Sequence, residues 1–323
     1  MKTDSLTGVF FVYKYFSMEL YTKDNDGKMQ KIGDAQSIPV RLENLKSEVN
    51  KFWTEKKSGK HEGLAAKHEA ILSKDLIVSP ADFFEQVNKN HFIFQEFGPY
   101  SLKDFLKKAR LDQYVKPEYL DDCLAVNTPQ PAVGRGEFLL AANFANINFS
   151  EDSGDLIDDK GNKIEVKGKS ANLGGSNEMF KPMNGSVLFD IYGLFGTGTK
   201  EKNFTLEMID EIQGFLLKNK SKMLPLMMIL QNRRKPSRIL AKAMCELFNN
   251  EQDLKLVIAS AHLRNYMKLQ NANYLFALND NVFRGFKAPK NIKEAFEIVK
   301  HFNVTGWVTG NKGISISLKN GNK

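Results

Sequence analysis

Hydrophobic and polar positions in the first 130 residues follow mainly helical spacing. Apolar side chains three and four residues apart predict amphipathic helices over 42–53 and 62–72. The pair 79–80, Ser followed by Pro, predicts a further helix start, and 101–108 predicts a short helix. Residues 9–21 are rich in β-branched and aromatic side chains and predict a strand or hairpin arm. A mostly helical α+β region is therefore expected.

The pattern changes at 127–134, where two prolines lie within three residues and a glycine follows. Proline cannot continue a helix or donate to a sheet ladder, so this segment predicts a linker and a domain boundary after residue 130. Helices are expected over 137–146, 205–219, 238–248, 253–270 and 291–302, and strands over 154–157, 163–167, 273–278, 307–308 and 314–318. Alternation of helices and strands predicts an α/β domain on a central sheet over 131–323.

The net charge of +8 is distributed unevenly. Residues 1–130 hold 19 basic and 19 acidic side chains, so the whole excess lies in 131–323, with 27 of the 46 basic and 19 of the 38 acidic residues. This asymmetry favours contact of the second half with a polyanion, the alternative being a solvated, lysine-rich surface. Two cysteines exclude a disulfide framework, and no apolar run reaches membrane-spanning length. A cytoplasmic protein from a bacterial or viral setting is expected, with no membrane partner.

A β-hairpin is expected within 153–169, SGDLIDDKGNKIEVKGK. Gly161 suits the left-handed third position of a three-residue loop. Such a loop pairs Asp158 with Asn162 and thereby fixes the register of the two strands. The apolar side chains of the hairpin then share one face, which is expected to be the packed one.

The same register gathers charged side chains on the opposite face. Asp155 lies directly across from Glu165, and Lys167 points to the same side. Two facing carboxylates repel each other and are costly to bury unless a cation compensates. Carboxylate oxygens bind Mg²⁺, while the ammonium could orient or deprotonate a water or neutralise an oxyanion. The cluster favours metal-dependent phosphodiester hydrolysis, with an exposed charged hairpin as the alternative.

Asp155, nine intervening residues and then Glu165-Val166-Lys167 resemble the motif of the PD-(D/E)xK nuclease superfamily. The resemblance implies a restriction-endonuclease-like core, a mixed central sheet flanked by helices. In that core a helix precedes the motif hairpin, and a strand–helix–strand unit completes the sheet. The resemblance is close over 134–168 and elsewhere only topological. Gly154 replaces the proline of the superfamily's name.

The resemblance also implies roles for site residues. Asp155 and Glu165 would be metal ligands and Lys167 the catalytic lysine. Glu137, on the helix before the hairpin, matches an extra upstream carboxylate that binds or supports the metal. The implied cofactor is Mg²⁺, with Mn²⁺ as a substitute. Residues 1–130 resemble no family and are expected to supply specificity, docking or dimerisation, within a homodimer or a larger assembly.

Positive and polar residues elsewhere are candidates for nucleic-acid binding. Between Glu211 and Glu246 the chain has eight basic and no acidic residues, a segment that would repel itself unless solvated or paired with phosphates. The small residues of 168–175 could admit a phosphate backbone or form a surface loop. The candidates are Lys169, Ser170, Asn172, Arg233, Arg234, Lys235 and Arg238.

Together these patterns predict a Mg²⁺-dependent endonuclease that hydrolyses DNA by metal-activated water attack. A first alternative is a catalytically silent nuclease-fold protein that binds nucleic acid, for example a viral DNA-packaging or virion component. A second is a sequence-tolerant nucleic-acid-binding module, whose binding would be salt-sensitive and independent of Asp155 and Lys167.

Overall fold

The structure is a computed structural model, and it describes part of the chain. It gives the backbone pairing of three strands within 9–34. It further describes residues 42, 44–56, 63–93, 98, 100–126, 133–151, 154–169, 171–173, 213–214, 218, 253–308 and 313–320. The helices expected over 205–219 and 238–248 therefore lie almost wholly outside the described residues.

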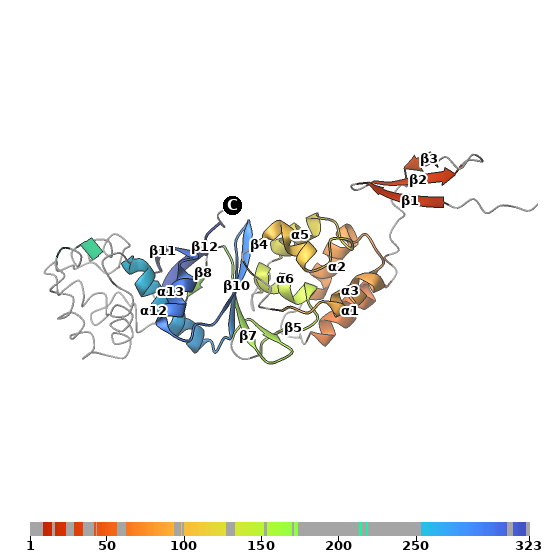
Figure 1. Cartoon of the computed structure of the whole chain (residues 1–323). Helices are drawn as coiled ribbons and strands as arrows, with labels where there is room; N and C mark the ends of the chain where they lie inside the picture. Colours follow the sequence, from red (N-terminus) through yellow and green to blue (C-terminus); the bar gives the residue numbers. More distant parts are fainter. Residues whose placement is uncertain are drawn as a thin grey trace, which may run out of the picture.

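Three N-terminal strands form an antiparallel sheet of their own in the order β1-β2-β3. They are β1 (Val9–Lys14), β2 (Ser17–Lys23) and β3 (Met29–Asp34). β1 and β2 pair as a hairpin, so the expectation of a strand or hairpin arm in this part of the chain is confirmed. Figure 1 shows this sheet apart from the helices that follow it.

A helical region comes next. Its helices are α1 (Leu45–Glu55), α2 (Leu64–Asp75), α3 (Pro80–Lys89), the short pair η2 (Leu102–Asp104) and α4 (Phe105–Lys108), and α5 (Glu118–Ala125). The expected start of α3 is confirmed, because Ser79 accepts a hydrogen bond from the Asp82 amide and Pro80 fills the first helical position. α5 was not expected from the sequence.

The central element is a six-stranded mixed sheet in the order β4-β10-β9-β7-β6-β5. The strands are β4 (Tyr100–Ser101), β5 (Ile147–Phe149), β6 (Leu156–Asp158), β7 (Lys163–Lys167), β9 (Tyr274–Leu278) and β10 (Val282–Lys287). β7 and β9 are parallel, and the other neighbours pair antiparallel. This sheet confirms the α/β class, although β4, β5 and β10 were not expected.

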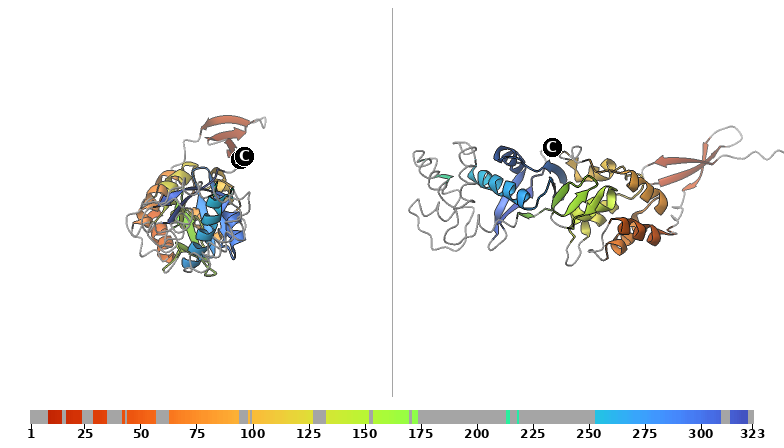
Figure 2. Two further views of the ribbon diagram at one scale, coloured as in Figure 1. Left: turned by 90° about the vertical axis from the view of Figure 1, so that its left-hand side faces the viewer. Right: turned by 90° about the horizontal axis from the view of Figure 1, so that it is seen from below.

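Helices cover both faces of this sheet, as Figures 1 and 2 show. The helix α6 (Arg135–Asn143) lies with α1–α5 on one face, and α12 (Leu254–Leu269) and α13 (Ile292–Val299) lie on the other. Alternate residues of β9 serve the two sides: Phe276 and Leu278 join the first core, while Leu275 and Ala277 join the second. A strand buried on both faces explains the continuous apolar run of β9.

A second three-stranded sheet borders α12 and α13. It contains β8 (Ala171–Leu173), β11 (Phe302–Val308) and β12 (Gly313–Leu318) in the order β11-β12-β8. The strand expected at 307–308 is thus longer, and the helix expected over 291–302 ends at Val299. Among the residues that the structure describes, no helix has both the length and the apolar character needed to cross a bilayer.

Buried polar contacts connect the N-terminal helices to α6. The Trp53 indole donates to His68 Nδ1 at 3.2 Å, His68 Nε2 lies 3.1 Å from the Tyr119 hydroxyl, and that hydroxyl donates to Asn143 at 3.1 Å. Burial lowers the pKa of His68 to about 3, so the ring is neutral and Nε2 carries its hydrogen. Trp53 also stacks on Phe138 of α6, with ring centroids 5.6 Å apart.

A buried lysine fastens the end of α6. Lys56, directly after α1, is 3% exposed and donates from Nζ to the backbone carbonyls of Phe144, Ala145 and Ile147. These carbonyls follow the last turn of α6, where helix acceptors lack partners. One hydrophobic core therefore holds side chains from both sides of residue 130. The domain division at that residue stays a prediction.

Candidate active site

Close packing against the sheet positions the start of α6. A Cβ added to Gly136 would collide with Leu278 Cδ2 and would lie 2.7 Å from Val166 Cγ1. Glycine at this point lets the helix approach β7 and β9, and the next residue, Glu137, then comes within electrostatic range of Asp155 and Lys167. The Gly134 amide, at the N-cap, hydrogen-bonds the Glu137 carboxylate, which resembles half of a capping box.

The hairpin has the register that the sequence predicts. Leu156 pairs with Ile164 in the β6–β7 ladder, and the Gly161 amide donates to the Asp158 carbonyl at 3.1 Å. Gly161 has φ 80°, the left-handed conformation expected of the third loop residue. The Asp158 carboxylate further accepts from the backbone amides of Lys160 and Asn162. Turn chemistry thus fixes which side chains meet across the two strands.

Two contacts hold the charged side chains of the hairpin, and the pairing of Asp155 with Glu165 across the strands stays a prediction. Glu165 Oε1 lies 2.5 Å from Lys167 Nζ, and Asp155 Oδ2 accepts from the Val166 amide at 2.7 Å. Ile164 and Val166 join the α1–α6 core, so Glu165 and Lys167 project toward α12. Glu165 is only 3% exposed, which the sequence did not predict, because α12 covers this face.

Tyr266 of α12 is a further member of the cluster. Its hydroxyl donates to Glu165 Oε1 at 2.5 Å, and Lys167 Nζ lies 5.1 Å from the centre of its ring. The sequence predicts a helix over 253–270, but nothing in it singles out Tyr266. The signal that could have found this residue is a tyrosine within an otherwise mainly apolar helix that packs on the motif face.

Burial and mutual repulsion perturb the carboxyl groups. Burial and the negative charge of Asp155 raise the pKa of Glu137 to about 7, although the hydrogen bond from the Gly134 amide acts in the opposite direction. Burial and the charge of Glu165 raise the pKa of Asp155 to about 6, although Lys167 acts in the opposite direction. Like charges therefore accumulate in a space that solvent screens poorly.

Lys167 is the cation that faces these carboxylates. Burial alone lowers the pKa of Lys167, but the charges of Glu165 and Asp155 more than offset this effect and hold the pKa above its ordinary value. The side chain is therefore an ammonium at neutral pH, suited to donating hydrogen bonds and neutralising charge. With Glu137, Asp155 and Glu165 ionised, three carboxylates face this one ammonium, and an added cation would relieve the imbalance.

Asp155 and Glu165 are the best candidates to hold a divalent ion. Asp155 directly precedes β6 and Glu165 lies in β7, close enough for the charge of Glu165 to raise the pKa of Asp155. Mg²⁺ commonly binds one or two carboxylates while keeping several waters. Within the described ranges, no three His, Cys, Asp or Glu side chains gather closely enough to enclose a metal ion. Glu137 as a third ligand stays a prediction.

The expected nucleic-acid contacts fall into two groups. Lys169 is 63% exposed and pairs with Asp280, and Asn172 is exposed in β8, where it accepts a hydrogen bond from Ser315 at 2.6 Å. The alternative prediction of a surface loop over 168–175 is wrong at 171–173, because these three residues form β8 and pair with β12. The other candidates lie outside the described residues: Ser170, Arg233, Arg234, Lys235 and Arg238.

The arrangement combines two carboxylates, a largely buried ammonium and a tyrosine hydroxyl beside β7, an inner strand of the mixed sheet. Carboxylates can hold a hard cation, and the ammonium can bind a water or an anionic oxygen beside it. No protein-family model, curated protein or solved structure matches this chain.

Proposed function

We propose that the chain is a Mg²⁺-dependent endonuclease that hydrolyses phosphodiester bonds in DNA. The observation that carries the proposal is the gathering of Asp155, Glu165 and Lys167 at the β6–β7 hairpin, where Glu165 pairs with Lys167 and both charges act on Asp155. Glu165 is buried and its charged neighbours are partly buried, and such a group of carboxylates around one ammonium is unfavourable for folding alone. Such a cost is commonly retained where the groups bind a ligand or act in catalysis.

The order of elements supports the resemblance to the restriction-endonuclease-like core. α6 precedes the hairpin, β7 and β9 are parallel, and α12 lies between them in the chain and covers the motif face. The resemblance implies a helix, the motif hairpin and then a strand–helix–strand unit; here β8, which belongs to another sheet, precedes α12 and β9. Because connections between parallel strands need a crossover, α12 is brought to the face that carries Glu165.

Each side chain has a proposed task. Asp155 and Glu165 would bind Mg²⁺, which when bound neutralises phosphate charge and lowers the pKa of a coordinated water. Lys167, already protonated, would hold the attacking water or the developing oxyanion by hydrogen bonding. Tyr266 would keep Glu165 oriented, and Glu137 would add negative charge at the helix start.

Plasmid cleavage tests this function. Purified protein is incubated with supercoiled DNA and Mg²⁺, with Ca²⁺ or with EDTA, and nicked and linear products are quantified. We expect cleavage with Mg²⁺, and a loss of at least about 10²-fold in Asp155→Ala and Lys167→Ala. Lys160→Ala is the matched control, because Lys160 is an exposed lysine in the turn of the same hairpin. Equal activity in Lys167→Ala and the control would overturn the proposal.

One observation favours the non-catalytic alternative. Glu165 Oε1 already accepts from both Lys167 and Tyr266, so the cluster is partly satisfied without a metal. A silent nuclease-fold protein that binds nucleic acid for packaging or assembly would have this closed arrangement. It predicts DNA binding that is retained in Asp155→Ala, with no cleavage under any metal condition.

A further inference from the structure

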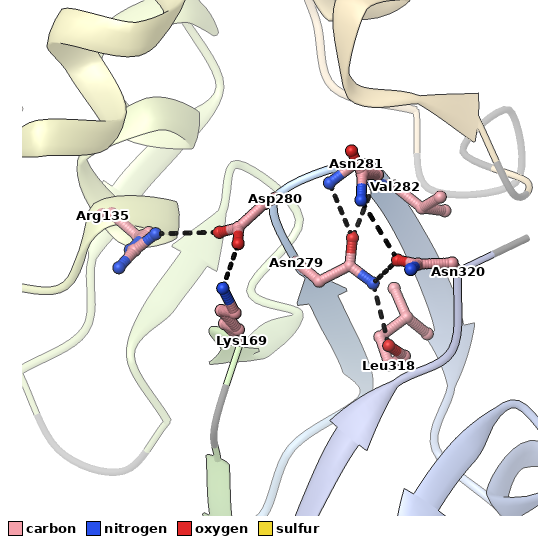
Figure 3. A network of polar contacts seen from close by, with 8 residues as sticks. All are labelled: Arg135, Lys169, Asn279, Asp280, Asn281, Val282, Leu318 and Asn320. Atoms are coloured by element: carbon pink, nitrogen blue, oxygen red, sulfur yellow. Dashed lines mark hydrogen bonds and ion pairs between the residues drawn. The ribbon is translucent and has the colours of Figure 1, made fainter.

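Arg135, Lys169 and Asp280 form an ion-pair cluster, as Figure 3 shows. Arg135 Nη1 lies 3.6 Å from Asp280 Oδ1, and Lys169 Nζ contacts Asp280 Oδ2. The side chains of Arg135, Lys169 and Asp280 are 45%, 63% and 47% exposed. One carboxylate therefore bridges two cations that a dissolved anion can also reach.

The topology puts this cluster at the same end of the parallel strands β7 and β9 as Lys167. β7 and β9 run parallel with Lys167 aligned to Ala277, so Lys169 and Asp280 leave the sheet at the same end. Arg135 begins α6, two residues before Glu137. Lys169 follows Lys167 by two residues, which span at most about 7 Å between Cα atoms. The cluster therefore lies near Lys167.

Asp280 sits on a turn that is held firmly. The Asn279 side chain accepts from the amides of Asn281 and Val282 at 2.8 Å each, and it donates to the Leu318 carbonyl at 2.8 Å and to Asn320 at 3.1 Å. Asn279 is only 6% exposed. The Asn279 side chain holds the turn against the end of β12. Separation of the ion pairs therefore requires movement of the long side chains of Arg135 and Lys169 and not of the turn.

We propose that Arg135 and Lys169 clamp a backbone phosphate of the DNA strand near the scissile phosphate, and that Asp280 occupies this clamp in the free protein. The inference rests on the proposed function and adds a phosphate subsite to it. Arginine and lysine are the side chains that most often bind phosphate, and a carboxylate offers them oxygens in a similar arrangement. Exposed ion pairs contribute little stability, so a phosphate can displace Asp280.

In this arrangement Asp280 competes with phosphate groups for Arg135 and Lys169. Every polyanion must displace it before it reaches the two cations, which lowers the affinity for all of them. A strand that also fills the active site gains contacts that offset the competition. Asp280 therefore lowers the affinity of both kinds of complex by a similar factor, and only a strand that also fills the active site stays tightly bound.

DNA binding without turnover tests the clamp. Fluorescence anisotropy of a labelled short DNA duplex is measured in EDTA between about 50 and 200 mM salt, where counterion release governs affinity. We expect Asp280→Asn to bind severalfold more tightly. The double variant Arg135→Gln/Lys169→Gln should bind more weakly, and its slope of log K against log salt should fall by about 0.9 for each lost contact.

A third variant separates the clamp from a general charge effect. Asp280→Asn added to Arg135→Gln/Lys169→Gln should give no gain in affinity, because Asp280 acts through these two cations. A gain of equal size in both backgrounds would mean that Asp280 is only one acidic charge among others, and the clamp would be overturned. An unchanged salt slope in the double variant would overturn it as well.

Matched controls and cleavage keep the two proposals distinguishable. Glu85→Gln and Lys89→Gln remove an exposed ion pair on α3 and should leave the salt slope unchanged. A wild-type protein that shows the clamp pattern but never cleaves DNA contradicts the proposed function and supports the subsite. Metal-dependent cleavage together with a salt slope that is insensitive to Arg135 and Lys169 does the reverse.

Discussion

Tyr266 donates its hydroxyl hydrogen to Glu165 at 2.5 Å across 101 residues of sequence. The accepting oxygen, Oε1, also pairs with Lys167 at 2.5 Å. A helix on one side and a strand neighbour on the other therefore hold the same carboxylate before any ion or substrate arrives. The orientation of Glu165 depends on α12 as much as on the hairpin.

Removal of this hydroxyl should be measurable. In Tyr266→Phe a buried charged acceptor loses one donor, so we expect the free energy of unfolding in urea to fall by about 1.5–3 kcal/mol. Any cleavage activity should lose kcat more than KM, because Tyr266 touches the carboxylate rather than the DNA. The control is Tyr114→Phe, whose hydroxyl contact to Gln86 is long, at 3.4 Å, and should cost much less. Equal losses in the two variants would contradict the argument.

The Lys167–Glu165 pair should show strong coupling. Both side chains are largely buried, 15% and 4% exposed, so Lys167→Met leaves an uncompensated carboxylate and should lower the free energy of unfolding by about 3–5 kcal/mol. Glu165→Gln added to Lys167→Met removes that charge and keeps an acceptor for Tyr266. The double variant should therefore regain much of the loss in a double-mutant cycle measured by urea unfolding. Strictly additive losses would show that the two groups do not interact.

Gly136 should tolerate no side chain. Gly136→Ala would push a methyl group into Leu278 and Val166, and overpacking of this kind costs about 1–3 kcal/mol. Thermal unfolding should report the loss, and DNA cleavage should fall because the start of α6 moves away from the hairpin. Gly168→Ala is the control for stability, since nothing lies within 4 Å of its added Cβ. A stable Gly136→Ala protein would mean that α6 shifts without penalty.

Stability of the metal-free protein should depend on pH through Glu137 and Asp155. Their pKa values rise from 4.5 to about 7 and from 3.8 to about 6, so the folded state binds protons more tightly than the unfolded state. The stabilising contribution is therefore complete below about pH 4 and is lost as the pH rises toward 7. Urea unfolding of wild type and Glu137→Gln across this range should give curves that diverge. Parallel curves would show that protonation of Glu137 does not contribute to the pH dependence of stability.

The local chemistry of the hairpin was predictable because it depends on a few adjacent residues. Gly161 and Asp158 determine the loop, the loop determines the register, and the register brings Asp155, Glu165 and Lys167 together. The α/β class followed in the same way from alternating helical and strand patterns. The spacing of charged residues was enough to find the centre of the candidate site.

Contacts between distant segments could not be predicted in this way. Tyr266 and Asp280 join the site region through the parallel pairing of β7 with β9, which no local pattern specifies. β5 is only three residues long and β10 carries Arg284 and Gly285 among its apolar residues, so neither has a clear strand signature. The burial of Glu165 likewise depends on where α12 packs.

Trp53 gives the molecule an intrinsic optical probe. It is one of two tryptophans in the chain, is 2% exposed, and its indole stacks on Phe138, the residue after Glu137. Its emission should therefore be blue-shifted in the native state and should respond when the helix carrying Glu137 shifts. Quenching or a spectral change on addition of a divalent ion or DNA would therefore report binding at the candidate active site without any attached dye.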